Sequence, residues 1–480
     1  MDLNRQMMLD RMLHSDASYN GRFLTGVVTT GIYCLPSCRA RKPKPENVEF
    51  FARPEEAEAA GLRPCRRCRP DLFYRDCDPD RLLVERLVAR LRADPAAYGN
   101  VRDLVLQSGV GSSKLNELFR RHYHTTPAEM LGHERIERAC RELVTTRRPI
   151  ADVGFEVGYE TLSAFNENFR ERNRMSPRRY RQLAAASRFE IELPAWFQTR
   201  RVLAYLGRDP ASLTEVVRDG VFHFAIHADG GPVAVSVTIE SGKARCRLEP
   251  SGALAPGCGC AVHRRVLRFL GLTIDPQPFE RHLRRTPQHA RLIAGRRGLT
   301  IPQTRDVVDA LVWVVVGQQI SLPIALALRR RLTELAGTRV NDRLFVPPTA
   351  ESLARLEESH LRAIGFSRRK AEYLTGIARS VVAGSLDPEG LRERTATEIE
   401  RTLLKVHGLG PWSVHYLMMR AFSLADCVPV GDVALAKSLM EFFDLPERPS
   451  GPQTLELMQP FAPYRSLATF HLWTRLGEVQ

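Results

Sequence analysis

The stretch that decides the architecture of the C-terminal half is Leu403-Leu404-Lys405-Val406-His407-Gly408-Leu409-Gly410-Pro411-Trp412. It predicts two helices joined by a turn of the pattern Gly-x-Gly. Gly408 and Gly410 let the backbone come close to a phosphate and direct amide groups towards it. We therefore predict that these two glycines contact a nucleic-acid backbone.

Residues suited to chemistry follow this turn. Asp432 comes directly after Pro429-Val430-Gly431, and Trp412 and Tyr416 are four residues apart, which places them on one face of a helix. Two simpler interpretations stay open. The aromatic side chains can belong to the core, and Asp432 can cap a helix, alone or in addition to a catalytic role.

Two further motifs extend the pattern, Gly317-Gln318-Gln319-Ile320-Ser321 upstream and His471-Leu472-Trp473 downstream. Together they resemble the helix-hairpin-helix DNA glycosylases, in particular the AlkA type of 3-methyladenine DNA glycosylase II. The resemblance covers about residues 190–480 and is weaker before Thr300. It implies an enzyme that takes an alkylated base, such as 3-methyladenine or 7-methylguanine, out of the stack and hydrolyses its N-glycosidic bond.

The resemblance also implies a role for each residue. Gln319 fills the gap left by the extruded base, and Asp432 stabilises the oxocarbenium-like sugar or activates water. Trp412, Tyr416 and Trp473 form a pocket whose π-faces attract a cationic base by about 0.5–2 kcal/mol. Bifunctional relatives have a lysine at the position of Trp412, so we expect a monofunctional glycosylase without strand cleavage.

An internal repeat lies in residues 81–185. Phe119 precedes Pro127 by eight residues, and Phe169 precedes Pro177 by the same spacing. Each unit predicts two helices around a glycine-containing turn. Two helical hairpins packed on each other would fit, but the repeat resembles the AraC-type DNA-binding domain, whose second helices enter the major groove. The candidate base-reading residues are Ser112, Ser113, Lys114 and Asn116 in the first unit, and Glu160, Thr161, Ser163 and Asn166 in the second.

Four of the ten cysteines form two close pairs near the N-terminus, Cys34-x3-Cys38 and Cys65-x2-Cys68. This spacing is typical of a tetrahedral zinc site, so we predict one Zn²⁺ bound by all four thiolates. Basic residues flank both pairs and would bring a DNA backbone close to a thiolate. They are Arg39, Arg41, Lys42 and Lys44 after the first pair, and Arg63, Arg66, Arg67 and Arg69 around the second.

The segments Thr29 to Arg41 and Arg63 to Cys68 resemble the N-terminal zinc domain of the bacterial Ada family, over about residues 15–75. The resemblance implies that Cys34 irreversibly accepts a methyl group from a DNA methylphosphotriester. Zinc would keep the sulfur a nucleophilic thiolate at neutral pH. Methylation removes one of the negative charges of the site, which should strengthen DNA binding and make repair a switch.

The other cysteines are interpreted as chemically unremarkable. The Ada family often ends in a second methyltransferase domain with a Pro-Cys-His-Arg motif, and this chain has none, so we expect no repair of alkylated guanine oxygen by that route. Cys77 is not expected to be a ligand. Cys258-Gly259-Cys260 is expected to be a loop without metal.

Composition limits the class of protein. The 480 residues carry 70 Lys and Arg against 55 Asp and Glu, a formal charge of +15, and 44% hydrophobic residues, which suits a basic globular protein that binds a polyanion. The longest apolar run, Ala310 to Val316, is too short to cross a membrane. We find no secretory signal, and we expect a bacterial cytoplasmic, nucleoid-associated protein.

The predicted fold class is multidomain. Residues 1–80 form a small α+β zinc domain, 81–185 an all-α tandem helix-turn-helix domain, 188–299 an α+β subdomain and 300–480 an all-α helix-hairpin-helix domain. The expected partners are double-stranded DNA, both alkylated and promoter DNA, and RNA polymerase. The alternative is a methylation-responsive transcription activator whose C-terminal half binds DNA or a modified base without cutting.

Overall fold

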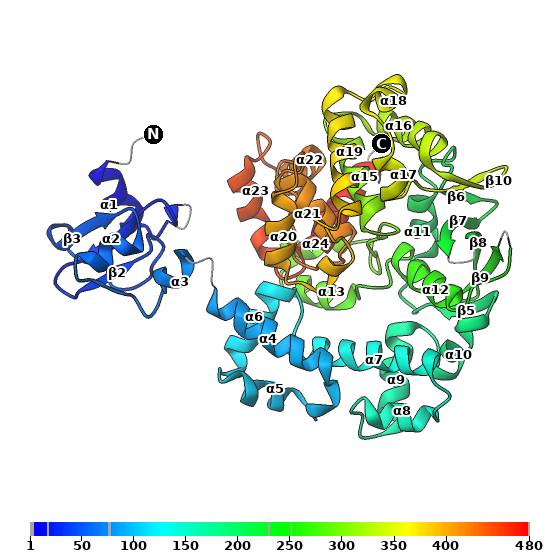
Figure 1. The fold of residues 1–480 in the computed structure, drawn as a ribbon, viewed down its shortest axis with the longest axis horizontal. Coiled ribbons are helices and arrows are strands. Elements are labelled where there is room, and N and C mark those ends of the chain that lie inside the picture. The colour runs from blue at the N-terminus through cyan, green and yellow to red at the C-terminus, as the bar shows by residue number, and fades with distance from the viewer. Residues whose placement is uncertain (1–3, 17–18, 75–77, 229–230, 251, 479–480) are drawn as a thin grey trace. The chain divides into compact units, whose positions relative to one another are not determined.

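The computed structural model describes residues 4–16, 19–74, 78–228, 231–250 and 252–478 (Figure 1). The chain divides into two compact units, Met1–Arg86 and Leu87–Gln480. Helix α4 (Pro79–Ala93) contains the boundary between them. Cys77 lies outside the described residues.

The first unit is built on a four-stranded sheet of order β3-β1-β2-β4. Strand β2 pairs antiparallel with β1 and parallel with β4, so the two cysteine pairs leave neighbouring strands at the same edge. Leu24 and Tyr33 are fully buried in its core. The elements are β1 (Leu24–Val27), β2 (Ile32–Cys34), β3 (Val48–Phe51), β4 (Arg63–Pro64), α1 (Arg5–Leu13), α2 (Pro54–Ala59) and α3 (Pro70–Tyr74).

The repeat forms the two predicted helical pairs. Gly109 and Gly158 have φ of 70° and 96°, the left-handed conformation that lets each first helix end in a tight turn. Thr126 and Ser176 cap the helices that begin at the repeated prolines. The helices are α5 (Val101–Ser108), α6 (Ser112–Tyr123), α7 (Pro127–Thr145), α8 (Ile150–Glu156), α9 (Leu162–Asn173) and α10 (Pro177–Gln182).

An antiparallel sheet of order β5-β9-β8-β7-β6 follows. Its core is continuous with that of the second helical pair, because Phe169 and Tyr180 belong to the same buried cluster as Phe222 and Val266. The strands are β5 (Arg188–Glu192), β6 (Glu215–Arg218), β7 (Val221–Ala228), β8 (Gly231–Glu240) and β9 (Lys243–Pro250), and the helices are α11 (Thr199–Leu206) and α12 (Cys258–Phe269).

The structure corrects the expectation of a loop at Cys258-Gly259-Cys260. These residues form the first turn of α12, and both cysteines are buried. A Cβ on Gly259 would lie 2.2 Å from the carbonyl oxygen of Leu183, so the glycine allows α12 to pack closely against the end of the helical repeat. The helix starts without a side-chain cap, so the usual start signal of a helix is missing from the sequence here.

The remainder is helical and surrounds one large buried cluster. Its helices are α13 (Gln277–Leu283), α14 (Pro287–Ala290), α15 (Val307–Gly317), α16 (Leu322–Ala336), α17 (Ala350–Ala354), α18 (Glu358–Ala363), α19 (Arg368–Val382), α20 (Ala396–Leu404), α21 (Pro411–Arg420), α22 (Val433–Phe442), α23 (Gly451–Met458) and α24 (Arg465–Glu478). One hairpin interrupts them, β10 (Thr338–Asn341) with β11 (Leu344–Val346). It packs Leu344 and Val346 on Ala225 and Ala234 of the five-stranded sheet.

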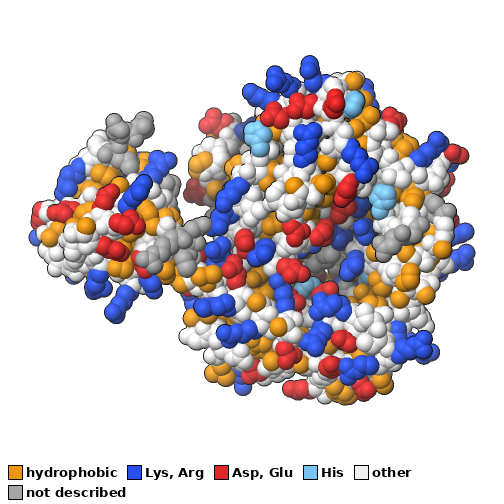
Figure 2. Space-filling model, in the orientation of Figure 1, with side chains coloured by type: hydrophobic (Ala, Val, Ile, Leu, Met, Phe, Trp, Pro, Cys, Tyr) orange, Lys and Arg blue, Asp and Glu red, His pale blue; other side chains and the backbone are white. Residues whose placement is uncertain are grey.

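The predicted multidomain fold class is thus confirmed. Among the described residues, no helix is long and apolar enough to cross a membrane. On the face in Figure 2, Lys and Arg side chains are interspersed with acidic ones over both units.

Candidate metal centre and base pocket

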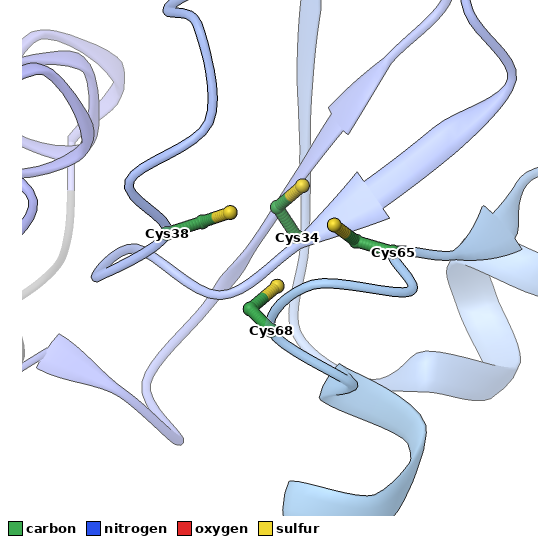
Figure 3. A group of neighbouring side chains, drawn as sticks. All are labelled: Cys34, Cys38, Cys65 and Cys68. Carbon is green, nitrogen blue, oxygen red and sulfur yellow. The ribbon is translucent and has the colours of Figure 1, made fainter. Parts of the chain in front are cut away.

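The four predicted ligands meet at one point. The sulfur atoms of Cys34, Cys38, Cys65 and Cys68 all lie within 4.8 Å of one another, and Figure 3 shows the side chains converging from the two turns. A tetrahedral zinc with sulfur at about 2.3 Å requires sulfur atoms about 3.8 Å apart. The site therefore fits Zn²⁺, as the cysteine spacing predicts.

The close approach of the thiols shifts the pKa values of individual cysteines in opposite directions. Hydrogen bonding with Cys38 and Cys68, together with burial, raises the pKa of Cys34. Hydrogen bonds from Cys34 and Cys68 lower the pKa of Cys38 to about 2. The mutual contacts of these sulfur atoms thus shift the pKa values of Cys34 and Cys38 in opposite directions, and a bound divalent ion would supply the positive charge that stabilises neighbouring thiolates.

The sulfur atoms differ in exposure and in hydrogen bonding. Cys38 and Cys65 are buried, whereas Cys34 and Cys68 are half-buried. The sulfur of Cys68 accepts a hydrogen bond from the amide of Leu35 at 3.4 Å. A hydrogen bond draws electron density from a thiolate. Cys34 is half-buried as a residue, and no backbone amide among the described residues is found to donate to its sulfur.

Some of the basic residues around the cysteine pairs are exposed, and others make hydrogen bonds that hold the cysteine turns in place. Arg39, Arg41, Arg66 and Arg67 are exposed, as DNA contacts require. Arg67 also donates to the carbonyl oxygen of Arg39 at 3.0 Å, which ties the two cysteine turns together. Lys42 instead points inward. Its Nζ donates to the carbonyl oxygen of Cys38 at 2.8 Å, and burial lowers its pKa.

The candidate base-reading residues lie on α6 and α9 or at their starts. Asn166 is exposed, and Lys114 is half-buried with its ammonium 3.5 Å from Glu117. Thr161 is the N-cap of α9, since its side chain accepts from the amide of Ala164.

The far end of α6 contacts the C-terminal helices, which the sequence did not indicate. The imidazole of His124 accepts from the amide of Asp426 at 3.1 Å, and burial lowers the pKa of His124 to about 4. His122 Nδ1 lies 3.2 Å from the hydroxyl of Thr397 at the start of α20. The first helix-turn-helix pair and the C-terminal helices are therefore packed together.

The Gly-x-Gly turn lies between α20 and α21, where it was predicted. Gly408 has φ of 92°, and a Cβ there would lie 2.4 Å from the ring of Tyr373. No side chain fits at this position. Gly410 has φ of −103°, and nothing lies within 4 Å of where a Cβ would be, so neither the backbone conformation nor the space at this position requires a glycine.

The predicted pocket residues come together around Asp432. The carboxylate accepts from the indole nitrogen of Trp412 at 2.8 Å and from that of Trp473 at 3.0 Å. It also accepts from the amide of Leu435 at 2.7 Å, because Asp432 is the N-cap of α22. The cap interpretation is therefore correct, and the same side chain is held by two tryptophans.

The three aromatic rings form a continuous row. The centroids of Trp412 and Tyr416 are 5.7 Å apart, and those of Tyr416 and Trp473 are 6.1 Å apart. The hydroxyl of Tyr416 accepts from the indole nitrogen of Trp313 at 3.0 Å, a partner that sequence reasoning missed. Trp313 lies within the apolar run of α15 and reads there as an ordinary core residue, so no signal distinguished it.

Family models agree with this organisation. The metal binding domain of Ada matches residues 8–71, a helix-turn-helix domain matches residues 104–183, and the HhH-GPD superfamily of base excision DNA repair proteins matches residues 312–463. The resemblances identified in the sequence are thereby confirmed.

Relatives cover either the whole chain or its C-terminal part. A probable bifunctional transcriptional activator/DNA repair enzyme AlkA of Mycobacterium tuberculosis is 29% identical over 96% of this chain and 94% of its own length. The DNA-3-methyladenine glycosylase of Bacillus subtilis is 33% identical over 59% of this chain and 95% of its own length. The solved 3-methyladenine DNA-glycosylase from Archaeoglobus fulgidus shares the fold, with a TM-score of 0.53 and 23% identity over 59% of this chain and 97% of that one.

The chain belongs to the DNA-3-methyladenine glycosylase family, and it carries an Ada-type zinc-binding domain and a helix-turn-helix domain before the glycosylase fold.

Proposed function

We propose that the C-terminal half of this protein hydrolyses the N-glycosidic bond of alkylated purines in duplex DNA, with Asp432 as the catalytic carboxylate. The observation that carries the proposal is the carboxylate of Asp432, fixed by two indole N–H groups at a row of three aromatic rings. A cationic base such as 3-methyladenine would bind the rings. The Gly408 turn would hold the phosphate backbone while Gln319 fills the gap.

The proposed reaction uses water. The bond between the sugar C1′ and the base nitrogen breaks, the electron pair leaves with the base, and a water oxygen bonds to C1′ while losing a proton. Asp432 already accepts three hydrogen bonds, which leaves about one acceptor position of its carboxylate for that water or for the cationic sugar. Because Trp412 stands where a lyase lysine would be, the product is an abasic site in an unbroken strand.

The test is release of free 3-methyladenine from methylated duplex DNA by the wild type and by Asp432→Asn. We expect the substitution to lower single-turnover release by about a hundredfold or more. Asp444→Asn, a change at a side chain that is 85% exposed, is the matched control and should release base normally. Release by neither the wild type nor Asp432→Asn would favour the alternative, a regulator that binds DNA without cutting.

We also propose that Cys34 is the acceptor in a stoichiometric methyl transfer from DNA methylphosphotriesters. The sulfur attacks the methyl carbon, the carbon–oxygen bond breaks, and the phosphodiester leaves with the electron pair and a negative charge. Two observations favour Cys34 over the other ligands. It is half-buried whereas Cys38 and Cys65 are buried, and the amide hydrogen bond from Leu35 reaches the sulfur of the other half-buried cysteine, Cys68.

Mass spectrometry of peptides after reaction with methylated DNA tests this assignment. We expect one added methyl group on Cys34 and none on Cys68, and modification of Cys68 instead would refute it. Measuring DNA affinity at fixed salt before and after the transfer tests the proposed switch. In this proposal methylated protein binds promoter DNA through α6 and α9 at the nucleoid and recruits RNA polymerase.

A further inference from the structure

The turn between α15 and α16 carries Gln319 in an unusual conformation. Gln319 has φ of 57°, the left-handed region that favours glycine, and its side chain is exposed. A non-glycine residue stays in this region only where its surroundings hold it there. The neighbours of this turn are therefore the residues that determine where Gln319 points.

Gln318 connects this turn to the Gly-x-Gly hairpin. Its amide nitrogen donates to the carbonyl oxygen of Gly408 at 2.8 Å and lies 3.3 Å from the hydroxyl of Ser413 in α21. The residue next to Gln319 is thus bonded directly to the hairpin and to the helix that the hairpin begins. A movement of the hairpin must be followed by the turn, or these bonds must break.

Helix α19 contacts both the end of α15, next to the turn of Gln319, and the Gly-x-Gly hairpin. Nζ of Lys370 donates to the carbonyl oxygen of Val316, in the last turn of α15, at 2.7 Å. The lysine is 9% exposed, and burial lowers its pKa. Tyr373, three residues further on the same helix face, packs its ring against Gly408. One helix face thus supports the turn of Gln319 through Lys370 and the hairpin through Tyr373.

We infer that Gln318 and Lys370 are positioning residues that make phosphate binding by the hairpin and insertion of Gln319 into the duplex a single event. The inference rests on the proposed function of the C-terminal half. The hairpin would bind the backbone beside the lesion, and the linked turn would bring Gln319 to the gap at the same moment. Neither positioning residue would touch the base or the sugar.

This coupling matters only where extrusion of the base is costly. A lesion paired with its normal partner must be unpaired and unstacked, whereas one opposite an abasic analogue has no pairing to lose. A loss of coupling should therefore slow excision from the paired duplex more than from the duplex with the analogue. A loss of catalytic geometry at Asp432 would slow both equally.

The test measures single-turnover excision of one alkylated purine in these two duplexes by the full-length protein and by Gln318→Met and Lys370→Met. Methionine matches the length of glutamine, is one atom shorter than lysine, and removes the donors of both. We expect excision from the paired duplex to fall about tenfold, as for the loss of one or two hydrogen bonds, and excision opposite the analogue to fall much less. Equal losses on both duplexes, or no loss on either, would overturn the inference.

Two further measurements separate this inference from its premise. Gln453→Met removes a glutamine whose contact is with Ser450, at the start of α23, and serves as the matched control for stability. Fluorescence of 2-aminopurine placed beside the lesion reports insertion of Gln319 without any cleavage. If Asp432→Asn and the wild type both failed to excise, the proposed function would fail. A reduced fluorescence response in Gln318→Met would still support the coupling, and an unchanged response would refute it.

Discussion

The four-cysteine centre and the proposed base pocket are two candidate sites that the chain builds in different ways. The four cysteines lie within 35 residues, on turns that leave adjacent strands β2 and β4. The pocket joins Trp412, Asp432 and Trp473, which come from three helices, through hydrogen bonds to a single carboxylate. The first site is defined by a ligand set that a metal must complete, and the second by the packing of helices. This difference predicts that removing the metal disrupts only the first site, whereas changes that weaken helix packing disrupt only the second.

Removal of zinc should have the largest effect, and only on the first site. Structural zinc contributes roughly 10–16 kcal/mol of binding free energy to small domains, so a chelator should unfold the first unit and abolish methyl transfer. All four tryptophans, Trp196, Trp313, Trp412 and Trp473, lie in the second unit, and their fluorescence reports that unit alone. We expect an unchanged unfolding midpoint by fluorescence and unchanged excision. A parallel loss of excision would show that the two sites are not independent.

Acid should weaken the packing of the second unit through His263. This side chain is fully buried and donates from Nε2 to the carbonyl oxygen of Asn173 at 2.8 Å, and burial lowers its pKa from about 6.5 to about 4. The unfolded chain then binds the proton more readily, so stability falls as pH decreases from about 6.5 towards 4, by up to about 3 kcal/mol. His263→Gln should flatten this dependence in denaturant unfolding followed by tryptophan fluorescence. An unchanged slope with pH would contradict the assignment.

Gly408→Ala should disturb the hairpin beside the pocket. The new methyl group would overlap the ring of Tyr373 in a left-handed backbone, at a cost of about 1–3 kcal/mol. We expect a lower melting temperature and weaker binding to duplex DNA. Gly410→Ala is the matched control, since its φ is −103° and the space is open, and it should change the melting temperature little. Similar effects of both substitutions would mean that packing on Tyr373 is not the reason for Gly408.

Trp412→Phe tests whether the indole N–H groups orient Asp432. The substitution keeps an aromatic ring and removes the donor at 2.8 Å, and a hydrogen bond to a carboxylate contributes about 1.5–3 kcal/mol. We expect single-turnover excision to fall about ten- to a hundredfold. Tyr416→Phe removes only the hydroxyl that accepts from Trp313 and should cost less. Equal losses would show that the indole N–H of Trp412 is not what orients Asp432 for excision.

The smallest effect is expected at the basic surface of the first unit. Arg66→Ala should reduce the slope of log affinity against log salt by about one, as for one phosphate contact. Lys42→Met is the comparison, because that lysine donates to the carbonyl oxygen of Cys38 and should leave the slope unchanged while lowering stability. If Lys42→Met also reduced the slope of log affinity against log salt, the ammonium of Lys42 would be a DNA contact in the wild type.

The sequence was sufficient for those parts that short spacing specifies. The spacing of the cysteine pairs predicted the zinc site, the repeated Phe and Pro predicted the two helical pairs, and the Gly-x-Gly motif predicted the hairpin between two helices. Sequence reasoning failed for elements with weak local patterns and for contacts between residues far apart in the chain. The hairpin β10–β11 is too short for alternation to appear, and α12 begins without a cap. Neither Trp313 nor Gln318 could be given a partner, because those partners lie about 90 to 100 residues away in the chain.

The sequence by itself determined which chemical groups this protein has: four thiolates at ligand spacing, three aromatic rings, one carboxylate and a turn open to phosphate. Only the tertiary structure decided how these groups are held. In the folded chain both indole nitrogens donate to Asp432, the ammonium of Lys42 donates to the carbonyl oxygen of Cys38, and the side chain of Gln318 donates to the carbonyl oxygen of Gly408. The physical reason is that local spacing fixes which residues share a turn or a helix face, whereas hydrogen bonds between distant segments depend on how whole helices pack.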